Sequence, residues 1–364
     1  MITHVVAAGQ LGGETALWSQ LHETVPSLSS PFFSPEFTAI VAAARGDVQI
    51  AVLEQEGRTV GFFPFQRGRL GVGRPVGSVL SDYHGAVIAE EATWDAAALI
   101  RACGLGSWDF HHLLAYQAPF EPYHRAQDTS KQVDLAGGFD GYMAVLDAAH
   151  GPTLARLQRK VRKLEREHGG LRFVPHSAEP EALRTLLEWK ATQYKRTGTV
   201  DLTRQRWICE VLERAHASQT EAFAGILSSL YAGERLVASH LGVRAGAVCH
   251  SWFQVYDPQF ASYSPGLVLL LRLCEWAPTA GIATIDLGRG DYRFKKMLTN
   301  RGVMLAEGAV TVPSLAAVAT RSRRAARSLV RRTAVAPRVR RIARALTPPR
   351  VASHATGGGA DARN

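Results

Sequence analysis

The sequence predicts an α/β protein organised as two domains, and three observations support this prediction. First, 364 residues are too many for one ordinary hydrophobic core, and 46% of them are hydrophobic, which provides ample apolar surface to bury. Second, segments with helical periodicity alternate with segments typical of strands. Third, residues 51–65 and 228–243 repeat one pattern, a strand, a glycine-containing turn and a second strand, which reflects either a duplication or two ordinary hairpins.

The first half contains a helix followed by a hairpin. Ser34-Pro35 is a favourable N-cap and first-turn pair, and it predicts a helix over 34–45. Two short apolar runs flank a turn around Gly57 and predict a hairpin. The elements expected after the helix are strands at 48–54 and 59–65, a helix at 94–103, a strand at 110–116 and a polar loop at 119–131.

The second half begins after the Gly137-Gly138 break. Leu154, Leu157, Val161 and Leu164 recur at steps of three and four residues, which predicts an amphipathic helix. The elements expected here are helices at 153–168, 179–196 and 203–217, strands at 223–231, 235–244 and 247–256, a helix at 266–277, a strand at 282–287 and a short helix at 292–299. We therefore expect domains at 1–135 and 136–313, with 153–217 as a helical insertion, and a tail at 314–364.

The net charge of +10 is concentrated in that tail. Residues 314–364 contain twelve Arg and one acid, whereas the preceding residues carry 30 bases and 31 acids. The tail has no aromatic residue and few large apolar ones, so we expect it to be flexible or to form a marginal basic helix on an anionic membrane surface. The basic composition therefore does not by itself predict a nucleic-acid-binding protein.

Several classes of protein and of site are disfavoured. The four Cys residues are far apart and lie in no Cys/His cluster, which argues against a disulfide framework and a structural zinc site; no metal is expected. We find no secretory signal and no apolar run long enough to span a bilayer, so a cytoplasmic protein is expected, with attachment to the inner face of the membrane as an alternative. Motifs of serine hydrolases, zinc proteases and nucleotide-binding loops are not found.

Polar residues that suit a binding site gather at 247–298. On strand 247–256, one alternating face carries His250, Trp252, Gln254 and Tyr256, and His240 lies on the preceding strand. This face is either the wall of a ligand site or a half-solvated sheet surface. The following helix begins at Tyr263-Ser264-Pro265-Gly266, where unpaired N–H groups suit a phosphate; an ordinary helix start is the alternative.

Other candidate residues lie on the helix 179–196 and in two turns. Lys190 lies on the apolar stripe of that helix, where it either extends past the core to solvent or points into a cleft. Asp286, Arg289 and Asp291 follow an apolar strand and flank glycines, as in a binding loop or an ion-paired turn. The Ser81–Gly85 segment, which includes Asp82 and His84, either lines a cleft or forms a polar turn.

Seven ordered segments resemble one family. They are FFSPEF (32–37), VGFFPF (60–65), LSDYHG (80–85), RKLEREHG (162–169), LEWKATQY (187–194), YSPGLVLL (263–270) and IDLGRGDYRFKK (285–296). Together they resemble the FemAB-like, CelD-type branch of the GNAT acyltransferase superfamily, over roughly residues 15–312.

This resemblance implies tandem GNAT-like domains with mixed, mostly antiparallel sheets, in which the C-terminal copy forms most of the active site. It also implies acetyl-CoA or another acyl-CoA as co-substrate. Strand 247–256 would pair with the pantetheine arm, the turn Tyr263–Leu267 would face the pyrophosphate, and Asp286 to Lys296 would border the acyl group. The acceptor would be an amine or hydroxyl of a small molecule or glycan, in cell-envelope or exopolysaccharide metabolism.

One motif departs from the family pattern. The usual phosphate loop, Gln/Arg-x-x-Gly-x-Gly/Ala, is replaced here by Ser264-Pro265-Gly266. Two alternatives therefore stay open: FemAB-type transfer from aminoacyl-tRNA, and a non-catalytic scaffold in a polysaccharide-synthesis assembly. The basic helix 153–168 is either a solvated face or a contact for tRNA or an anionic glycan.

GNAT-type transfer predicts roles for the candidate residues. The general base is expected to be His240, then His250, then Asp291, and Tyr292 or Tyr256 would return the proton. The residues expected to bind the donor are Trp252, Gln254, Tyr256, Tyr263, Ser264, Gly266, Arg289, Lys295 and Lys296. The residues expected to bind the acceptor are Asp82, His84, Lys190, Gln193, Tyr194 and Asp286, with Lys190, Lys295 and Lys296 also available to neutralise phosphate.

Overall fold

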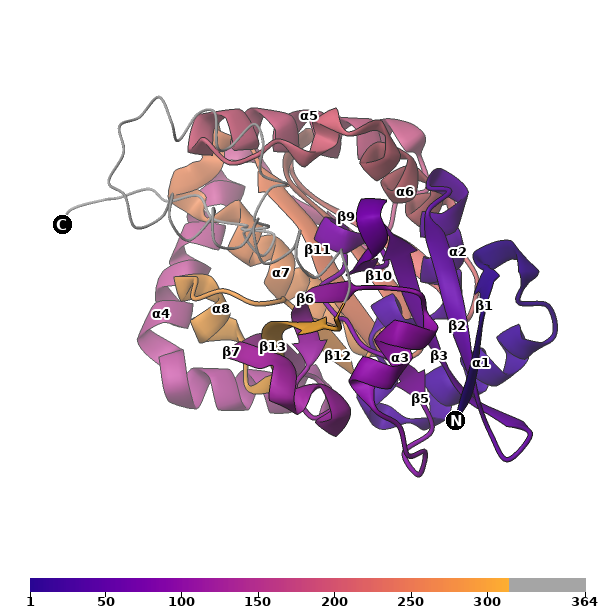
Figure 1. Ribbon diagram of the computed structural model, residues 1–364. Helices are drawn as coiled ribbons and strands as arrows, with labels where there is room; N and C mark the ends of the chain where they lie inside the picture. The colour runs from indigo at the N-terminus through magenta and orange to yellow at the C-terminus, as the bar shows by residue number, and fades with distance from the viewer. Residues whose placement is uncertain (314–364) are drawn as a thin grey trace, which may run out of the picture. The chain divides into compact units, whose positions relative to one another are not determined.

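The computed structural model, drawn in Figure 1, describes residues 1–313. These residues divide into two compact units. Unit 1 comprises Met1–Leu28, Phe32–Asp128 and the described residues from Met304 onward, and unit 2 comprises Ser29–Pro31 and Thr129–Val303. The expected tail at 314–364, with its membrane contact, lies outside the described residues. Within the described part of the chain, no helix is both long enough and apolar enough to cross a bilayer.

Unit 1 is built on a sheet in the order β1-β2-β3-β4-β6-β13, with β5 paired to β3. All of these pairs are antiparallel except β4 with β6, which is parallel. Its elements are β1 (Ile2–Ala7), α1 (Glu14–Thr24), α2 (Pro35–Ala44), β2 (Val48–Gln55), β3 (Arg58–Arg67), β4 (Val72–Pro75), β5 (Val87–Ile88), α3 (Ala96–Ala102), β6 (Ser107–Leu114) and β13 (Arg301–Thr311).

Unit 2 is built on a sheet in the order β7-β12-β11-β10-β9-β8. Its pairs are antiparallel except β11 with β12, which is parallel. Its elements are β7 (His124–Asp134), α4 (Gly138–His168), β8 (Leu171–Val174), α5 (Pro180–Thr197), α6 (Arg206–Ala217), β9 (Ala224–Ala232), β10 (Arg235–Ala245), β11 (Val248–Tyr256), α7 (Pro265–Trp276), β12 (Thr284–Asp286) and α8 (Arg293–Leu298). The predicted α/β class with mixed, mostly antiparallel sheets is confirmed.

The two units repeat one order of elements. In each, a strand is followed by two helices, three antiparallel strands, a helix, and a strand parallel to the third of those strands. The two series are β1-α1-α2-β2-β3-β4-α3-β6 and β8-α5-α6-β9-β10-β11-α7-β12, and unit 1 has the two-residue strand β5 in addition, between β4 and α3. Apart from β5, the repeat that the two hairpins show therefore extends over the whole series.

The last strand of each sheet comes from the other half of the sequence. The segment after β6 forms β7, and its residues Gln132–Asp134 pair with β12. The segment after β12 and α8 forms β13, and its residues Leu305–Thr311 pair with β6. Because of this exchange, neither half of the sequence contains all the strands of its own sheet.

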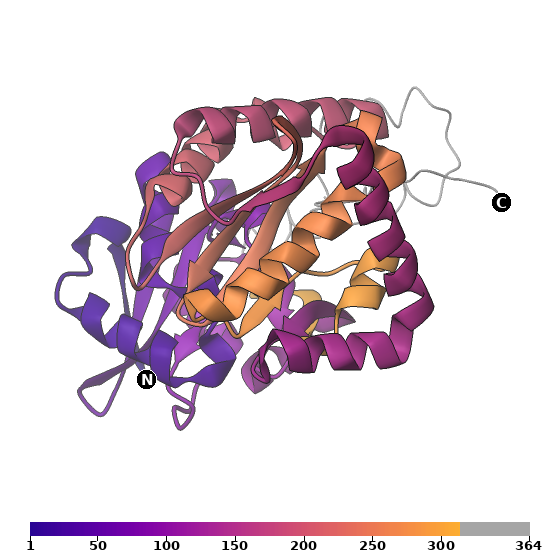
Figure 2. The same cartoon turned by 180° about the vertical axis from the view of Figure 1, so that it is seen from behind.

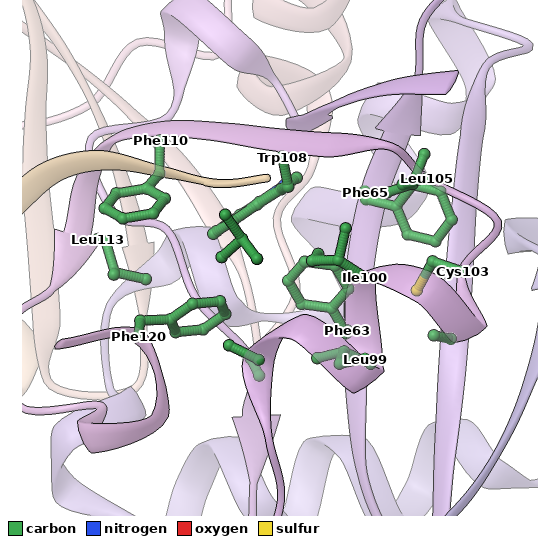
Figure 3. Close-up of a cluster of buried hydrophobic side chains, with 14 of the residues drawn as sticks. Phe63, Phe65, Leu99, Ile100, Cys103, Leu105, Trp108, Phe110, Leu113 and Phe120 are labelled. Atoms are coloured by element: carbon green, nitrogen blue, oxygen red, sulfur yellow. The ribbon is translucent and has the colours of Figure 1, made fainter. Parts of the chain in front are cut away.

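Aromatic side chains form the core of unit 1 on one face of its sheet. Figure 3 shows Phe63, Trp108, Phe110 and Phe120 gathered around Ile100 of α3. The rings of Phe63 and Trp108 meet edge to face with centroids 5.0 Å apart. Each such buried ring contributes about 1.5–3 kcal/mol relative to an exposed one.

The expected polar loop at 119–131 is wrong. Residues 118–123 form a short 3-10 helix that buries Phe120, and β7 starts at His124. Most side chains in the first half of β7 are exposed, so its sequence shows no apolar alternation. Its strand conformation depends on partners that are distant in the sequence.

Helices cover both faces of the sheet in unit 2. Figure 2 shows α7 crossing the strands with α4 beside it, and α5 and α6 pack on β9, β10 and β11 from the opposite face. The predicted stripe of α4 is confirmed, because Leu154, Leu157 and Leu164 are buried. The helix begins earlier than expected, at Gly138, and has a kink at His150, just before Pro152.

Candidate functional site

The parallel strands β11 and β12 are paired only at one end. Their pairing runs from Val248 with Thr284 to His250 with Asp286, where β12 ends. Strand β11 continues to Tyr256, and among the described residues only β10 pairs with it there. The stretch Ser251–Tyr256 is called the open edge of β11 below. Such an edge can bind an extended ligand through main-chain hydrogen bonds.

A β-bulge at Trp252 changes the direction of the side chains on β11. Leu241 of β10 is opposite Phe253 and its neighbour Gly242 is opposite Ser251, so Trp252 is the additional residue. The strict alternation expected for 247–256 is therefore wrong. Cys249 packs with the core residues of α7, and Gln254 also contacts α7, although regular alternation would put them on opposite faces.

Asp286 and His250 form a buried pair where the two strands separate. Nδ1 of His250 lies 3.6 Å from Oδ1 of Asp286, and both side chains are buried. The carboxylate of Asp286 accepts hydrogen bonds from Ser130 Oγ at 2.7 Å, Gln132 Nε2 at 2.8 Å and the Gly288 amide at 2.7 Å. Sequence reasoning missed both residues, because Ser130 lies in the expected loop 119–131 and no strand was expected at Gln132.

His240, the first expected base, lies on β10 opposite Gln254 of β11. It is fully buried, and its Nε2 is 2.9 Å from Ser251 Oγ. Burial, and then the neighbouring His250, lower the pKa of His240 to about 3. At neutral pH His240 is therefore a neutral, very weakly basic ring inside the sheet.

The first turn of α7 lies against basic residues of α4. Ser264, just before the helix, has left-handed backbone angles (φ 58°, ψ 47°). Its Oγ accepts a hydrogen bond from Lys160 Nζ at 3.0 Å, and Lys163 Nζ lies 5.6 Å from the centre of the Tyr263 ring. The sequence predicted only that Lys160 belongs to the basic face of the helix 153–168. Its contact with the start of α7 is evident only from the structure.

Gly266 lies where the first turn of α7 contacts β11. Its carbonyl accepts a hydrogen bond from Gln254 Nε2 at 2.5 Å, and a Cβ at this position would lie 3.3 Å from that nitrogen. Its own N–H belongs to the first helical turn, where amides have no partner within the helix. The start of α7, Lys160 and the end of the open edge of β11 therefore meet at one place.

Lys190 is buried on α5 and holds the main chain of β11. Its Nζ donates to the Gln254 carbonyl at 3.2 Å and lies 5.3 Å from the centre of the Tyr194 ring. No carboxylate among the described residues pairs with it, and burial lowers its pKa to about 7. The alternative in which this side chain extends to solvent is wrong, because Lys190 is fully buried.

Gln193 and Tyr194 are buried beside Lys190 on the same face of α5. Burial raises the pKa of Tyr194. Three of the expected acceptor-binding residues thus form one polar cluster under β11, on the opposite side from α7.

The two lysines of α8, the helix that follows the loop after β12, differ in burial. Lys295 is buried and donates to the carbonyls of Gly288 at 3.2 Å and Arg289 at 2.6 Å. Lys296 is exposed and pairs with Asp291 at 3.1 Å. This contact lowers the pKa of Asp291, which makes that carboxylate a poor base.

Tyr292 lies at the end of this loop, just before α8, and is half-buried. Its ring centre is 5.6 Å from Lys295 Nζ, and burial raises its pKa. This phenol is protonated at neutral pH, as a general acid must be, and its raised pKa makes it a weaker acid than an exposed Tyr.

The remaining two candidates, Asp82 and His84, are buried in unit 1. His84, His111 and His112 offer ring nitrogens within 4.8 Å of one another. However, His84 Nδ1 accepts from the His112 amide at 3.2 Å and Nε2–H donates to the Ser81 carbonyl at 3.0 Å. Both nitrogens of His84 are thereby used within the protein, so the cluster does not offer three available metal ligands in this conformation.

The fold agrees with comparisons to known proteins. Residues 153–296, which include this edge and the start of α7, match the family model for the acetyltransferase (GNAT) domain. The match covers less than half of the chain and lies within unit 2, which is therefore similar to this domain. No curated protein matches the sequence.

Two solved structures share the fold over most of the chain. FemX aligns with a TM-score of 0.58 at 11% identity and covers 85% of this chain and 96% of its own. The C-terminal domain of a putative lysylphosphatidylglycerol synthetase from Agrobacterium fabrum aligns with a TM-score of 0.50 at 13% identity, covering 84% of this chain and 95% of its own. At these identities the likeness concerns the fold.

Proposed function

We propose that unit 2 transfers an acyl group from acyl-CoA to an amine or hydroxyl acceptor, as a member of the FemAB-like, CelD-type branch. The observation that carries the proposal is the open edge of β11, which has the start of α7 at one end and the His250–Asp286 pair at the other. Six extended residues span about 20 Å. An extended donor with amides along its length and phosphates at one end matches this arrangement.

The phosphates of the donor bind at the start of α7 in this proposal. There the Gly266 amide and the Lys160 ammonium supply a helix N-terminus and a positive charge. The amides of the pantetheine arm pair with the open edge of β11. The thioester then lies near the Trp252 bulge, where main-chain N–H groups can stabilise the oxyanion.

His250 is the general base, and Asp286 orients its ring. The acceptor loses a proton to His250 and attacks the thioester carbonyl, forming the new C–N or C–O bond. The oxyanion collapses, the C–S bond breaks, and the CoA thiolate takes a proton from Tyr292. His250 is preferred to His240 because Asp286 lies beside it, and to Asp291 because Lys296 makes that carboxylate less basic.

Tyr292 is preferred to Tyr256 as the acid. A Cβ at Gly266 would lie 3.5 Å from the Tyr256 ring, so Tyr256 stands at the phosphate end of the open edge. Tyr292 belongs to the loop that begins directly after Asp286, at the acyl end.

A specific surface favours a second candidate, transfer from aminoacyl-tRNA. The half of α4 after its kink exposes a row of basic side chains that leads to Lys160 at the start of α7. The row consists of Arg156, Arg159, Arg162, Lys163 and Arg166. A nucleic acid whose acylated end entered beside β11 would have phosphates to contact this row, whereas CoA is too small to reach along it.

Thermal unfolding with ligands tests the proposal. Acetyl-CoA, longer acyl-CoAs and CoA should each raise the Tm of the wild-type protein. In Gly266→Val the added side chain meets Gln254 and Tyr256, so the increase should be lost. If no CoA raises the Tm but tRNA binds with a steep dependence on salt, the second candidate replaces the first. Failure of both ligands would favour the non-catalytic scaffold.

A further inference from the structure

Unit 1 contains the same parallel strand pair as unit 2, but the space beside it is filled by the chain itself. Strand β4 pairs with β6 only at Val72 with Ser107 and Gly73 with Trp108. Further along β6, His84 pairs with Leu113 in parallel. The His84 amide donates to the His112 carbonyl at 2.8 Å, and the Leu114 amide donates to the His84 carbonyl at 3.0 Å. The segment Ser81–Gly85 thus takes the position that remains open beside β11.

Buried side chains fix this segment. His84 uses both ring nitrogens within unit 1, as described above, and Nε2 of His112 lies 3.6 Å from Oδ1 of Asp82. The side-chain amide of Gln117 accepts from the Ala86 amide at 3.0 Å and donates to the Ala86 carbonyl at 2.7 Å. Moving the segment away would leave these buried polar groups without hydrogen-bond partners, which is unfavourable in free energy.

Strand β4 is also too short to present an open edge like that of β11. It has four residues against nine in β11. Directly after it, Gly77 and Ser78 adopt positive φ values of 74° and 45° and turn the chain away from the strand direction. An extended ligand would therefore have few main-chain groups of β4 to bind.

The helix that follows in unit 1 begins with a negative charge. Asp95 is the N-cap of α3, and its Oδ1 accepts from the Ala98 amide at 2.7 Å. In unit 2 the corresponding helix α7 has no side-chain cap, and a lysine lies beside it. A carboxylate at a helix start uses the amides that a phosphate would bind and repels its charge.

We propose that the donor position of unit 1 is permanently closed by Ser81–Gly85, so that each chain binds one donor molecule, in unit 2. The inference of a single donor rests on the proposed function, whereas the closure rests on unit 1 alone. In this arrangement Asp82 and His84 hold the closing segment in place and do not contact the acceptor. Unit 1 therefore keeps the fold of unit 2, but its own segment Ser81–Gly85 occupies the space in which unit 2 would bind the donor.

Calorimetric titration with CoA measures the number of sites. We expect one equivalent per chain, no residual binding in Gly266→Val, and unchanged affinity in Asp95→Asn, which keeps the N-cap hydrogen bond and removes the charge of α3. Two equivalents in the wild type, binding that survives Gly266→Val, or a second site created by Asp95→Asn alone would overturn the proposal.

Hydrogen exchange without ligand tests the closure even if CoA does not bind. The amides of His84 and Leu114 should exchange as slowly as the core of unit 1, and added CoA should not change them. In His84→Ala their exchange should accelerate at least tenfold, while core amides of β2 and β3 keep their rates. Fast exchange of His84 and Leu114 in the wild type would show that the segment opens, and would refute the closure whatever the donor is.

Discussion

Nδ1 of His250 lies 3.6 Å from the Asp286 carboxylate, and the two residues face each other in the last pair that joins β11 to β12. Beyond this pair the strands are no longer bonded. The relationship therefore places the acid–imidazole pair at the end of the open edge of β11, where the proposed thioester would lie.

Replacing His250 with Gln should lower kcat by about 10²–10⁴-fold, because transfer loses its general base. KM for the donor should change little, since the ring is not proposed to bind CoA. Steady-state rates with the true acceptor measure this effect. The control is Asp291→Asn, which should retain most of kcat; equal losses in both variants would contradict the assignment to His250.

Replacing Ser130 with Ala should destabilise the protein by about 1–3 kcal/mol, because the buried Asp286 carboxylate loses one of its hydrogen-bond donors. Urea unfolding monitored by circular dichroism gives the free energy of unfolding. Thr129→Ala changes the neighbouring residue and serves as a control. A free energy unchanged in Ser130→Ala would show that solvent replaces the hydroxyl and that the site is more open than the structure indicates.

Lys190 should make stability depend on pH. Its pKa is about 7 in the folded protein and near 10.4 when unfolded, so between these values the unfolded state binds more protons. Stability therefore increases with pH from about 7 to about 10, by up to ~1.4 kcal/mol per pH unit from this group.

Lys190→Met removes that contribution. The difference in free energy of unfolding between wild type and variant, measured in urea at several pH values, should favour the variant near pH 7 and shrink as the pH rises. A difference that is constant with pH would mean that Lys190 is not desolvated in the folded protein.

Lys160→Met should weaken CoA binding by about 5- to 10-fold, because one charged contact at the start of α7 is lost. Calorimetry compares it with Arg159→Met, an exposed neighbour on α4 that should leave CoA binding unchanged. The two candidate donors, acyl-CoA and aminoacyl-tRNA, predict different effects of these two variants on donor binding. With an aminoacyl-tRNA donor, both variants should weaken tRNA binding and reduce its salt dependence.

Separated halves of the chain should not fold alone. The fragment 1–135 lacks β13 and the fragment 136–313 lacks β7, so each loses a strand that its sheet requires. Neither should show a cooperative thermal transition, whereas residues 1–313 together should unfold cooperatively and bind the donor without the tail. A cooperative transition in either fragment would show that the exchanged strand is dispensable.

Local periodicity in the sequence determined most of the elements. The apolar stripe of α4, the hairpin of β2 and β3, and the meander of β9, β10 and β11 were predicted because their side-chain pattern follows the period of the element itself. The same kind of reasoning placed polar residues on β11 and at the start of α7. These patterns depend only on neighbours along the chain.

Tertiary structure alone decided how the site is assembled. Pairing of β7 with β12 brought Ser130 to Asp286, and packing of α4 on α7 brought Lys160 to Ser264. The bulge at Trp252 changed which side chains of β11 share a face, and burial next to His250 lowers the pKa of His240 to about 3. Register, burial and contacts between distant segments are set by the free energy of the whole fold, so a local pattern contains no record of them.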